Sequence, residues 1–408
     1  MKPMGPIPAG YAADAAHRLL LAGTPFDALI EAAGGTPLFV YDRAMVAARV
    51  ARLRAAVPGV DIHYAVKANP FPPLVDALAG LVDGLDIASA GEQRLALGRG
   101  IPAAALSFAG PGKRDDEIAG AIAAGVTLNL ESAGEAERAL AAAARLGRRP
   151  RLAVRVNPDF ELRGSGMRMG GGAKPFGIDV DQVPDLVRRL RAAGADWRGF
   201  HIYAGSQSLD ADGLIEAQAA TLDLAARLAA AVGEAPPLVN LGGGFGIPYF
   251  AGDAALDVER IGAALLAALA RRPPALAHSR FALELGRWLV AEAGVYLTRI
   301  VDRKTSHGQT FLIVDGGLHH QLAASGNFGT VVRRNYPLAV AGRFGLAAEE
   351  TVSVCGCLCT PLDRLGDQVA LPRAEVGDVI AIFCAGAYGA SASPAAFLGQ
   401  GPATERLV

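Results

Sequence analysis

Cysteine is scarce in this sequence, and none occurs before Cys355. The four cysteines, Cys355, Cys357, Cys359 and Cys384, are too few to form the disulfide framework that stabilises small secreted domains. Long apolar runs are also missing. The N-terminal stretch MKPMGPIPAGYAADAAHRLL has no apolar core before a small-residue cleavage site, and no segment approaches a membrane span. We therefore expect reduced thiols, no membrane partner and a cytoplasmic protein.

An excess of either charge is absent as well. Lysine and arginine number 39 against 40 acidic residues, a net charge of -1. This balance provides no electrostatic basis for binding nucleic acid, so we do not expect that partner. What the chain does contain is apolar mass: 51% of its 408 residues are hydrophobic and 19% are charged, which is typical of a globular protein with a large core in two domains.

Short β-rich runs alternate with alanine- and leucine-rich segments of helical period from about residue 60, such as DDEIAGAIAAG and EAERALAAAARL. This alternation favours an α/β fold, a (β/α)8 barrel rather than an open sheet, and we assign it residues 40–287. The candidate strands are DIHYAV (61–66), LDIAS (85–89), ALSFA (105–109), VTLNL (126–130), LAVRV (152–156), GFHIY (199–203), LVNL (238–241) and FALEL (281–285).

After Arg287 the pattern changes to strand-like segments with few helical periods between them, which predicts an all-β domain over residues 288–408. These segments are VAEAGVYLTRIV, TFLIVDGG, TVSVCGCLC and DVIAIFCAG. We expect residues 1–39 to join this domain, because TPLFVY, which begins at Thr36, has an extended pattern. The loop SGMRMGGGAKPFG (165–177) follows the fifth barrel strand and is either a lid or an exposed insertion.

Polar side chains collect just after the barrel strands, at positions that face one mouth of such a barrel. Together they offer what pyridoxal phosphate needs: an amine for its aldehyde, backbone N–H groups for its phosphate and a carboxylate for its pyridine nitrogen. The positions are Lys67 after the first strand, Asp86 and Ser89 at the second, Tyr203 and Ser206 at the sixth, GGGFG (242–246) after the seventh, and Glu284 with Arg287 at the eighth.

Lys67 is the centre of this prediction. An arbitrary lysine at a strand end is usually a surface residue, but HYAVKANP surrounds Lys67 with apolar residues, and we expect desolvation to favour its neutral, nucleophilic amine. GGGFG by itself indicates only a turn, although after a strand and before a helix it can bind an anion. Glu284 by itself could be an ion-pair partner of Arg287.

Taken together, these motifs resemble those of the fold-type III pyridoxal-phosphate-dependent amino acid decarboxylases, the group of the diaminopimelate, ornithine and arginine decarboxylases. The resemblance extends over residues 36–398 and is closest to the subfamily associated with exosortase and exopolysaccharide gene clusters, through FHIYAGSQ and GAYGASASPAAFLG. The motifs in family order are HYAVKANP, DIASAGE, AGPGKRDDEI, AGSQ, NLGGGFG, ELGR, CLCTPLD and GAYGASAS.

The resemblance implies an alanine-racemase-like barrel followed by a β domain, and a head-to-tail homodimer with shared active sites. It also implies that Lys67 binds the cofactor covalently, that Glu284 faces the pyridine nitrogen, and that Cys359 reaches in from the other subunit to protonate the product. The further cofactor-binding positions that it implies are Asp86, Tyr203, Ser206, Gly243, Gly244, Gly286, Arg287 and Tyr388.

Two departures from the family pattern bear on the chemistry. Tyr203 stands where most members have a ring-stacking histidine, and tyrosine carries no charge near neutral pH; His201 matches an earlier family position. Thr360 follows Cys359 where the diamino-acid decarboxylases have an acidic residue that pairs with the distal amine. A simple basic diamino acid is therefore less favoured as substrate, although Asp363 keeps its family position and could receive an amine.

Arg333, Arg334 and Tyr336, in VVRRNYP, lie near the positions where the family binds the far end of the substrate. Two arginines would suit a carboxylate or a phosphate there, and the alternative is an exposed basic pair. In VSVCGCLC the three thiols recur at every second residue, on one face of a predicted strand. That geometry is poor for wrapping a metal ion, so we expect none.

The predicted activity is α-decarboxylation of an amino acid that is free, tethered to a carrier protein or otherwise modified, with release of carbon dioxide and an amine. Two alternatives stay open: an amino-acid racemase on the same fold, and a non-catalytic pyridoxal-phosphate-binding regulatory paralogue. The presence of Lys67, Glu284 and Cys359 in one chain favours the decarboxylase.

Overall fold

The computed structural model describes residues 1–326 and 333–408, which sort into two compact units. The barrel unit comprises residues 49–246 and 256–286, and the β unit comprises residues 1–48, 247–255 and 287–408. The chain therefore leaves the barrel unit for a short excursion, residues 247–255, before the last barrel strand. The barrel range that we predict from the sequence, residues 40–287, is continuous and so counts residues 247–255 as part of the barrel. Both predicted domain ranges stay predictions.

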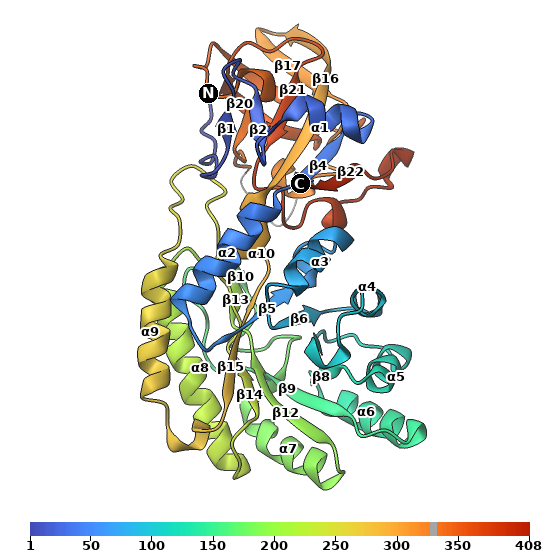
Figure 1. The fold of residues 1–408 in the computed structure, drawn as a ribbon, viewed down its shortest axis with the longest axis vertical. Helices are drawn as coiled ribbons and strands as arrows, with labels where there is room; N and C mark the ends of the chain where they lie inside the picture. The colour runs from blue at the N-terminus through green and yellow to red at the C-terminus, as the bar shows by residue number, and fades with distance from the viewer. Residues whose placement is uncertain (327–332) are drawn as a thin grey trace. The chain divides into compact units, whose positions relative to one another are not determined.

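Parallel strands close into the predicted (β/α)8 barrel (Figure 1), because the last strand of the sheet pairs back onto another member of the same path. Every strand expected from the sequence overlaps one barrel strand, which confirms the fold class. Around the barrel the strands follow the order β9-β12-β14-β15-β5-β6-β7-β8. Their bounds are β5 Asp61–Ala65, β6 Gly84–Ile87, β7 Leu106–Phe108, β8 Thr127–Leu130, β9 Arg151–Asn157, β12 Asp196–Ile202, β14 Leu238–Asn240 and β15 Arg280–Leu285.

Helices cover the outside of the barrel strands (Figure 1). Several of them begin at side-chain caps: Ser89, Ser132, Asp210 and Asp257 each accept a hydrogen bond from the backbone N–H three residues further on. Ser89 thus caps a helix, a local reason for its place after the second strand. The helices are α2 Arg43–Ala56, α3 Pro72–Ala79, α4 Ala90–Gly98, α5 Asp115–Ala124, α6 Ala133–Leu146, α7 Val183–Ala192, α8 Ala211–Val232 and α9 Val258–Ala270.

The long loop after β9 is attached to the barrel unit by backbone hydrogen bonds. Its short strand β10 (Met167–Arg168) pairs antiparallel with β13 (Gly205–Ser206), and β11 (Ile178–Asp179) extends the sheet beside β9. The Gly170 N–H also donates to the Ala204 carbonyl at 3.0 Å. The loop therefore lies against the segment that carries Ser206; its role as a lid stays a prediction.

The β unit contains the strands expected after Arg287, and TPLFVY forms β4 (Leu38–Tyr41), which pairs with β16 and β22. Its core joins residues of the N-terminal segment, such as Leu19 and Leu38, to Leu297 and Phe383 of the C-terminal segment. The main strands are β16 Gly294–Ser306, β17 Gln309–Val314, β18 Leu338–Val340, β19 Glu350–Cys355, β20 Arg364–Leu371, β21 Val379–Ile382 and β22 Thr404–Leu407. The shorter elements at the N-terminus are β1 Ala12–Ala13, β2 Leu19–Leu21, β3 Thr24–Pro25 and α1 Phe26–Ala33.

One expectation for the β unit is wrong. We predict from the sequence that three thiols share one face of a strand, but β19 ends at Cys355, and Cys357 and Cys359 lie in irregular chain. The physical reason is the carboxylate of Asp363, which accepts a hydrogen bond from the Leu358 N–H at 2.9 Å and draws the chain into a turn.

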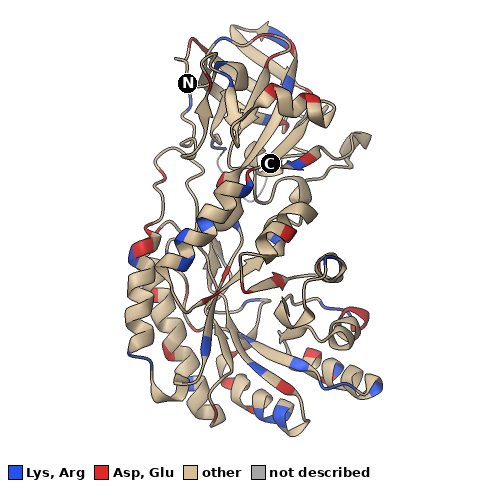
Figure 2. Cartoon of the chain, viewed as in Figure 1, with Lys and Arg blue, Asp and Glu red and all other residues tan. Residues whose placement is uncertain are grey.

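Charges of both signs are interspersed along the helices of the barrel unit (Figure 2), in keeping with the net charge of -1. Across residues 1–326 and 333–408, no helix combines the length and the apolar character that crossing a membrane requires.

Candidate active site

The carboxylate of Glu284 lies near the C-terminal end of β15, where only 5% of the residue is exposed. Its Oε2 is 2.9 Å from His201 Nε2, and its Oε1 is 3.6 Å from Lys67 Nζ. Burial opposes the negative charge, but Lys67 and His201 outweigh burial and hold the pKa of Glu284 well below its usual range. Because an ionised carboxylate only accepts hydrogen bonds, His201 Nε2 is the donor in this pair.

Lys67 lies in a 3-10 turn, Val66–Ala68, that follows β5. Val66 and Ala68 are buried, but the Lys67 side chain is 42% exposed. The expectation of a desolvated amine is therefore wrong: the turn buries the apolar neighbours and directs the lysine out of the packed layer. Its surroundings are polar and aromatic, with Glu284 at 3.6 Å and the centroid of the Tyr203 ring at 5.6 Å from Nζ.

Glycine is required at three of the predicted cofactor positions. A Cβ on Gly243 would lie 1.9 Å from the Glu284 carbonyl oxygen, and one on Gly244, whose φ is +85°, would lie 2.6 Å from the Gly205 oxygen. A Cβ on Gly286 would lie 2.8 Å from the Cβ of Ala68. The turn after β14 is thus packed closely against the residues around Glu284, and its bare backbone can approach an anion.

Asp86 has a partner that the sequence analysis missed. His63 Nδ1 lies 3.3 Å from Asp86 Oδ2, and both residues are buried. Burial disfavours the imidazolium, but the Asp86 carboxylate outweighs it and raises the pKa of His63. The sequence contained a signal for this contact. His63 alternates along β5 with Ile62 and Tyr64, so its side chain lies on the face of the sheet opposite to theirs.

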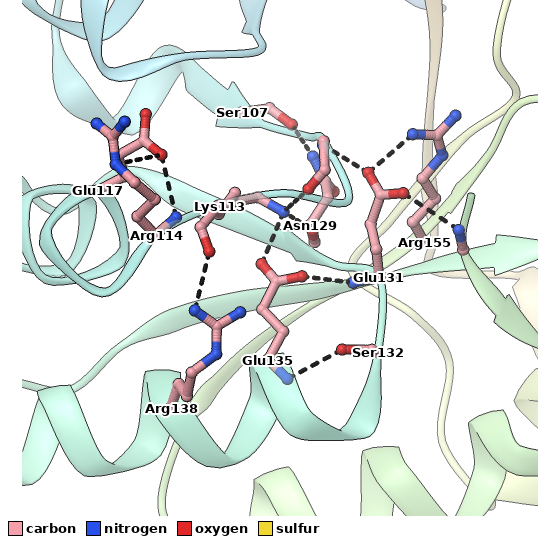
Figure 3. A network of polar contacts seen from close by, with 12 residues as sticks. Ser107, Lys113, Arg114, Glu117, Asn129, Glu131, Ser132, Glu135, Arg138 and Arg155 are labelled. Atoms are coloured by element: carbon pink, nitrogen blue, oxygen red, sulfur yellow. Dashed lines mark hydrogen bonds and ion pairs between the residues drawn. The ribbon is translucent and has the colours of Figure 1, made fainter. Parts of the chain in front are cut away.

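A buried ionic network lies at the C-terminal ends of the neighbouring strands β8 and β9 (Figure 3). Arg155 of β9 pairs with Glu131 at 2.8 Å, and Lys113 pairs with Glu135 at 2.7 Å. Glu131 also accepts a hydrogen bond from the Gly177 N–H at 3.2 Å, at the end of the long loop after β9. Burial opposes ionisation of Glu131, yet Arg155 lowers its pKa. The network therefore joins the end of this loop to the charged interior.

A second cluster forms within the β unit around Arg287, the first residue of α10 (Arg287–Val290). Its Nη1 donates to the Tyr249 hydroxyl at 2.9 Å, and its guanidinium lies 4.6 Å from the centroid of the Tyr388 ring. The Tyr249 and Tyr336 rings lie 4.7 Å apart. Arg287, Tyr388 and Tyr336 were predicted from the sequence, whereas Tyr249, which the 247–255 excursion brings into this unit, was missed.

The side chains of Arg333 and Arg334, which are neighbours in the sequence, contact different partners. The guanidinium of Arg334 lies 3.8 Å from the centroid of the Phe250 ring, a cation–π contact. Arg333 Nη2 instead approaches the Leu362 carbonyl at 3.4 Å, in the loop that follows Cys359. The two side chains therefore do not form a single fork for one anion, and their substrate-binding role stays a prediction.

The loop after β19 presents Cys359 to solvent and buries Asp363. The two carboxylate oxygens of Asp363 accept the backbone N–H groups of Leu318 at 2.7 Å and Leu358 at 2.9 Å. This residue is 3% exposed, and burial raises its pKa. We expect it to order the loop rather than bind substrate. The Thr360 hydroxyl accepts a hydrogen bond from the Leu362 N–H at 3.3 Å.

Comparison with known proteins identifies the class. Residues 43–291 match the family model described as pyridoxal-dependent decarboxylase, pyridoxal binding domain. The chain is similar to L-glutamyl-[BtrI acyl-carrier protein] decarboxylase of Niallia circulans, with 36% identity over 90% of this chain and 87% of that protein. It is similar to diaminopimelate decarboxylase of Archaeoglobus fulgidus, with 31% identity over 87% and 84%. The crystal structure of diaminopimelate decarboxylase from M. jannaschii superposes with a TM-score of 0.86 at 26% identity, covering 98% of this chain and 92% of that one.

These likenesses define a barrel enzyme that works with a pyridoxal cofactor. The chain belongs to the pyridoxal-dependent decarboxylase family, and it is an amino acid decarboxylase that uses pyridoxal phosphate. The relatives give no support to the alternative of a racemase.

The residues present fit this cofactor. Lys67 offers an accessible primary amine beside a buried anionic carboxylate, Glu284. The Gly243–Gly244 turn leaves no room for a Cβ, as expected where backbone must approach a phosphate. The Nδ1 of His201 is buried and has no hydrogen-bond partner among the described residues. This nitrogen can therefore still form a hydrogen bond with a bound group.

Proposed function

We propose that this enzyme α-decarboxylates an amino acid whose far end carries no free ammonium group, such as a glutamyl unit linked to a carrier. The supporting observation is the loop after Cys359. Thr360 provides only a hydroxyl there, and the carboxylate of Asp363 is buried and already accepts two backbone N–H groups. A charge-assisted partner for a distal ammonium is thus missing from this loop, although such a partner is worth about 1.5–3 kcal/mol.

We assign the cofactor roles residue by residue. Lys67 would hold pyridoxal phosphate covalently, and the anionic Glu284 would keep the pyridine nitrogen protonated, while His201 holds the Glu284 carboxylate in place. When bound, the cofactor supplies an aldehyde that an amine can capture and a ring that accepts the electron pair left by carbon dioxide. In this proposal Ser206, Gly243, Gly244, Arg287 and Tyr388 would hold the phosphate, and Asp86, Tyr203 and Gly286 would complete the surroundings of the cofactor.

Cys359 delivers the proton that completes the reaction. Its thiol is exposed on the loop after β19, as a group must be if it serves an active site of another subunit. In that arrangement the homodimer is part of the proposal, and the substrate α-carbon is protonated after carbon dioxide has left. Burial raises the pKa of Cys355 and Cys357, which favours their protonated thiols, and we assign neither residue a catalytic role.

Carbon dioxide release by the pyridoxal-phosphate-loaded enzyme tests the substrate class. The panel contains meso-diaminopimelate, L- and D-ornithine, L- and D-lysine, arginine, glutamate and a glutamyl-pantetheine thioester. We expect release from the thioester at a kcat/KM at least about tenfold above that for any diamino acid, since one lost charge-assisted contact is worth about a factor of ten.

Thr360→Asp is the matched variant, because it restores a carboxylate at the position after Cys359. It is expected to raise kcat/KM for the diamino acids relative to the parent protein and to lower it for the thioester. Rapid turnover of diaminopimelate or ornithine by the parent protein would refute the proposed substrate class while leaving the family assignment intact.

A further inference from the structure

The N-terminal end of the barrel contains a polar cavity of about 110 Å³ within the barrel unit. Its walls include the first residues of several strands: Asp61 begins β5, Arg151 begins β9 and Arg280 begins β15. The catalytic candidates Lys67 and Glu284 belong to the other ends of these strands. Bulky apolar side chains usually fill a barrel of this type, so a polar cavity at this end calls for an explanation.

Three arginines line the cavity, and the side chains of two of them, Arg151 and Arg198, make polar contacts with the described residues only at 3.3 Å or longer. Arg280 pairs with Asp61 at 2.6 Å. Arg151 donates to the Ala104 carbonyl at 3.3 Å, and its buried Nε has no hydrogen-bond partner among the described residues. Arg198 approaches Asp196 only at 3.5 Å. Arg151 and Arg198 therefore both line the cavity, and the buried Nε of Arg151 is a donor that no described residue uses.

The remaining acidic group in the wall is already engaged. Asp83 accepts the Ile62 N–H at 2.8 Å and pairs with Arg54 at 3.1 Å. Burial lowers the pKa of Arg151 and the charge of Arg198 lowers it further, while the Asp196 carboxylate offsets part of this effect. An anion placed between Arg151 and Arg198 would add to the compensation from Asp196 and could accept a hydrogen bond from the buried Arg151 Nε.

We propose that this cavity binds a small dianionic oxyanion, such as inorganic phosphate, between Arg151 of β9 and Arg198 of β12. Planar guanidinium forks suit an oxyanion because each can donate two parallel hydrogen bonds. The volume of about 110 Å³ accommodates phosphate, sulfate or a short dicarboxylate and is too small for a nucleotide. A bound anion ties adjacent strands together at the end of the barrel away from the chemistry.

Thermal unfolding of the pyridoxal-phosphate-loaded enzyme tests this site, since the bound cofactor already occupies its own phosphate position. Phosphate, sulfate and malonate are each titrated at constant ionic strength against sodium chloride. We expect a saturable rise in Tm of about 2 °C with phosphate or sulfate at a tenfold excess over Kd. The malonate series distinguishes a tetrahedral oxyanion from a carboxylate ligand. Equilibrium dialysis with labelled phosphate should find one exchangeable ion per chain.

The double variant Arg151→Gln/Arg198→Gln should lose both the rise in Tm and the exchangeable ion. Arg148→Gln, which removes an exposed arginine just before β9, is the matched control and should retain both. Arg198→Lys keeps the charge but not the fork, and should raise the phosphate Kd about tenfold even if the double variant does not fold. No saturable rise above chloride, or a rise that Arg198→Lys and the double variant retain in full, would overturn the proposal.

Discussion

The barrel unit and the β unit hold their candidate functional residues in opposite ways. In the barrel unit Glu284 and Arg155 are buried, and each meets a partner from another strand or loop. In the β unit Cys359 is exposed on a loop, and that loop is ordered by one buried carboxylate, Asp363. Buried charges with several partners tolerate little change, whereas an exposed loop tolerates much. We infer that the barrel unit preserves the chemistry of Lys67 and Glu284, while the loop that carries Cys359 in the β unit determines which substrate is accepted.

The largest expected effect tests the barrel side of this comparison. Lys67→Ala should remove covalent attachment of the cofactor and lower kcat by roughly 10³-fold or more, because no other amine lies beside Glu284 among the described contacts. Visible absorbance of the dialysed protein and carbon dioxide release measure the two effects. Lys304→Ala, which removes an exposed amine from β16, is the control and should change neither.

Glu284→Gln should retain the cofactor and lower kcat by roughly 10²–10³-fold, since a neutral amide cannot stabilise a protonated ring nitrogen. His201→Asn, which weakens the hold on Glu284 without removing its charge, should cost less. Equal losses in the two variants would show that His201 has a chemical role beyond positioning.

Breaking the buried pair at Glu131 tests the rigidity of the barrel unit. Glu131→Gln removes the carboxylate that pairs with the buried Arg155 and should lower the free energy of unfolding by about 3–5 kcal/mol. Chemical denaturation measures the loss, and hydrogen exchange at Gly177 should report loosening of the loop. Glu137→Gln removes a carboxylate from an exposed ion pair with Arg189 and is expected to have little effect.

Cys359→Ala tests the β-unit side. The variant should bind the cofactor normally and release carbon dioxide, but the amine should form about 10–100-fold more slowly or by protonation at the wrong atom. Mass spectrometry of the product in deuterated solvent separates these outcomes. Cofactor loss in this variant would count against the assigned role, and Cys355→Ala is the control.

A smaller effect concerns pH and the core of the β unit. His320 donates from Nε2 to the Gly401 carbonyl at 3.0 Å and accepts at Nδ1 from the Tyr296 hydroxyl at 2.9 Å, which requires a neutral ring. Burial and the neighbouring His319 lower the pKa of His320 to about 4 from its ordinary 6.5. Between pH 4 and pH 6.5, the imidazole of His320 binds a proton in the unfolded chain but stays neutral in the folded chain.

Stability should therefore fall by roughly 3 kcal/mol as the pH decreases from 6.5 to 4 through this one group. In His320→Gln the unfolding free energy should be lower at pH 7 and change less steeply with pH over that range. His278→Gln, at an exposed position, should leave the slope unchanged. An unchanged slope in His320→Gln would mean that other groups account for the acid sensitivity.

Several features could be read from the sequence because they depend on local pattern. Alternating apolar runs and helical periods predict the barrel, and the order of short motifs predicts the family. Glu284 could be predicted as a candidate because its neighbours FALEL form a strand whose C-terminal end must face the barrel mouth. Position along a strand is sufficient for such inferences.

Other features needed the folded chain. The sequence predicts a desolvated Lys67, but the turn after β5 exposes it, because burial of a side chain depends on the direction in which the backbone turns. The pairs His63–Asp86 and His201–Glu284 join residues of different strands, and no local pattern sets which side chains meet across a sheet. Thus the sequence by itself determined the fold class and the chemistry of the residues, while the tertiary structure decided which charges are buried together, because burial and pairing arise from contacts between distant segments.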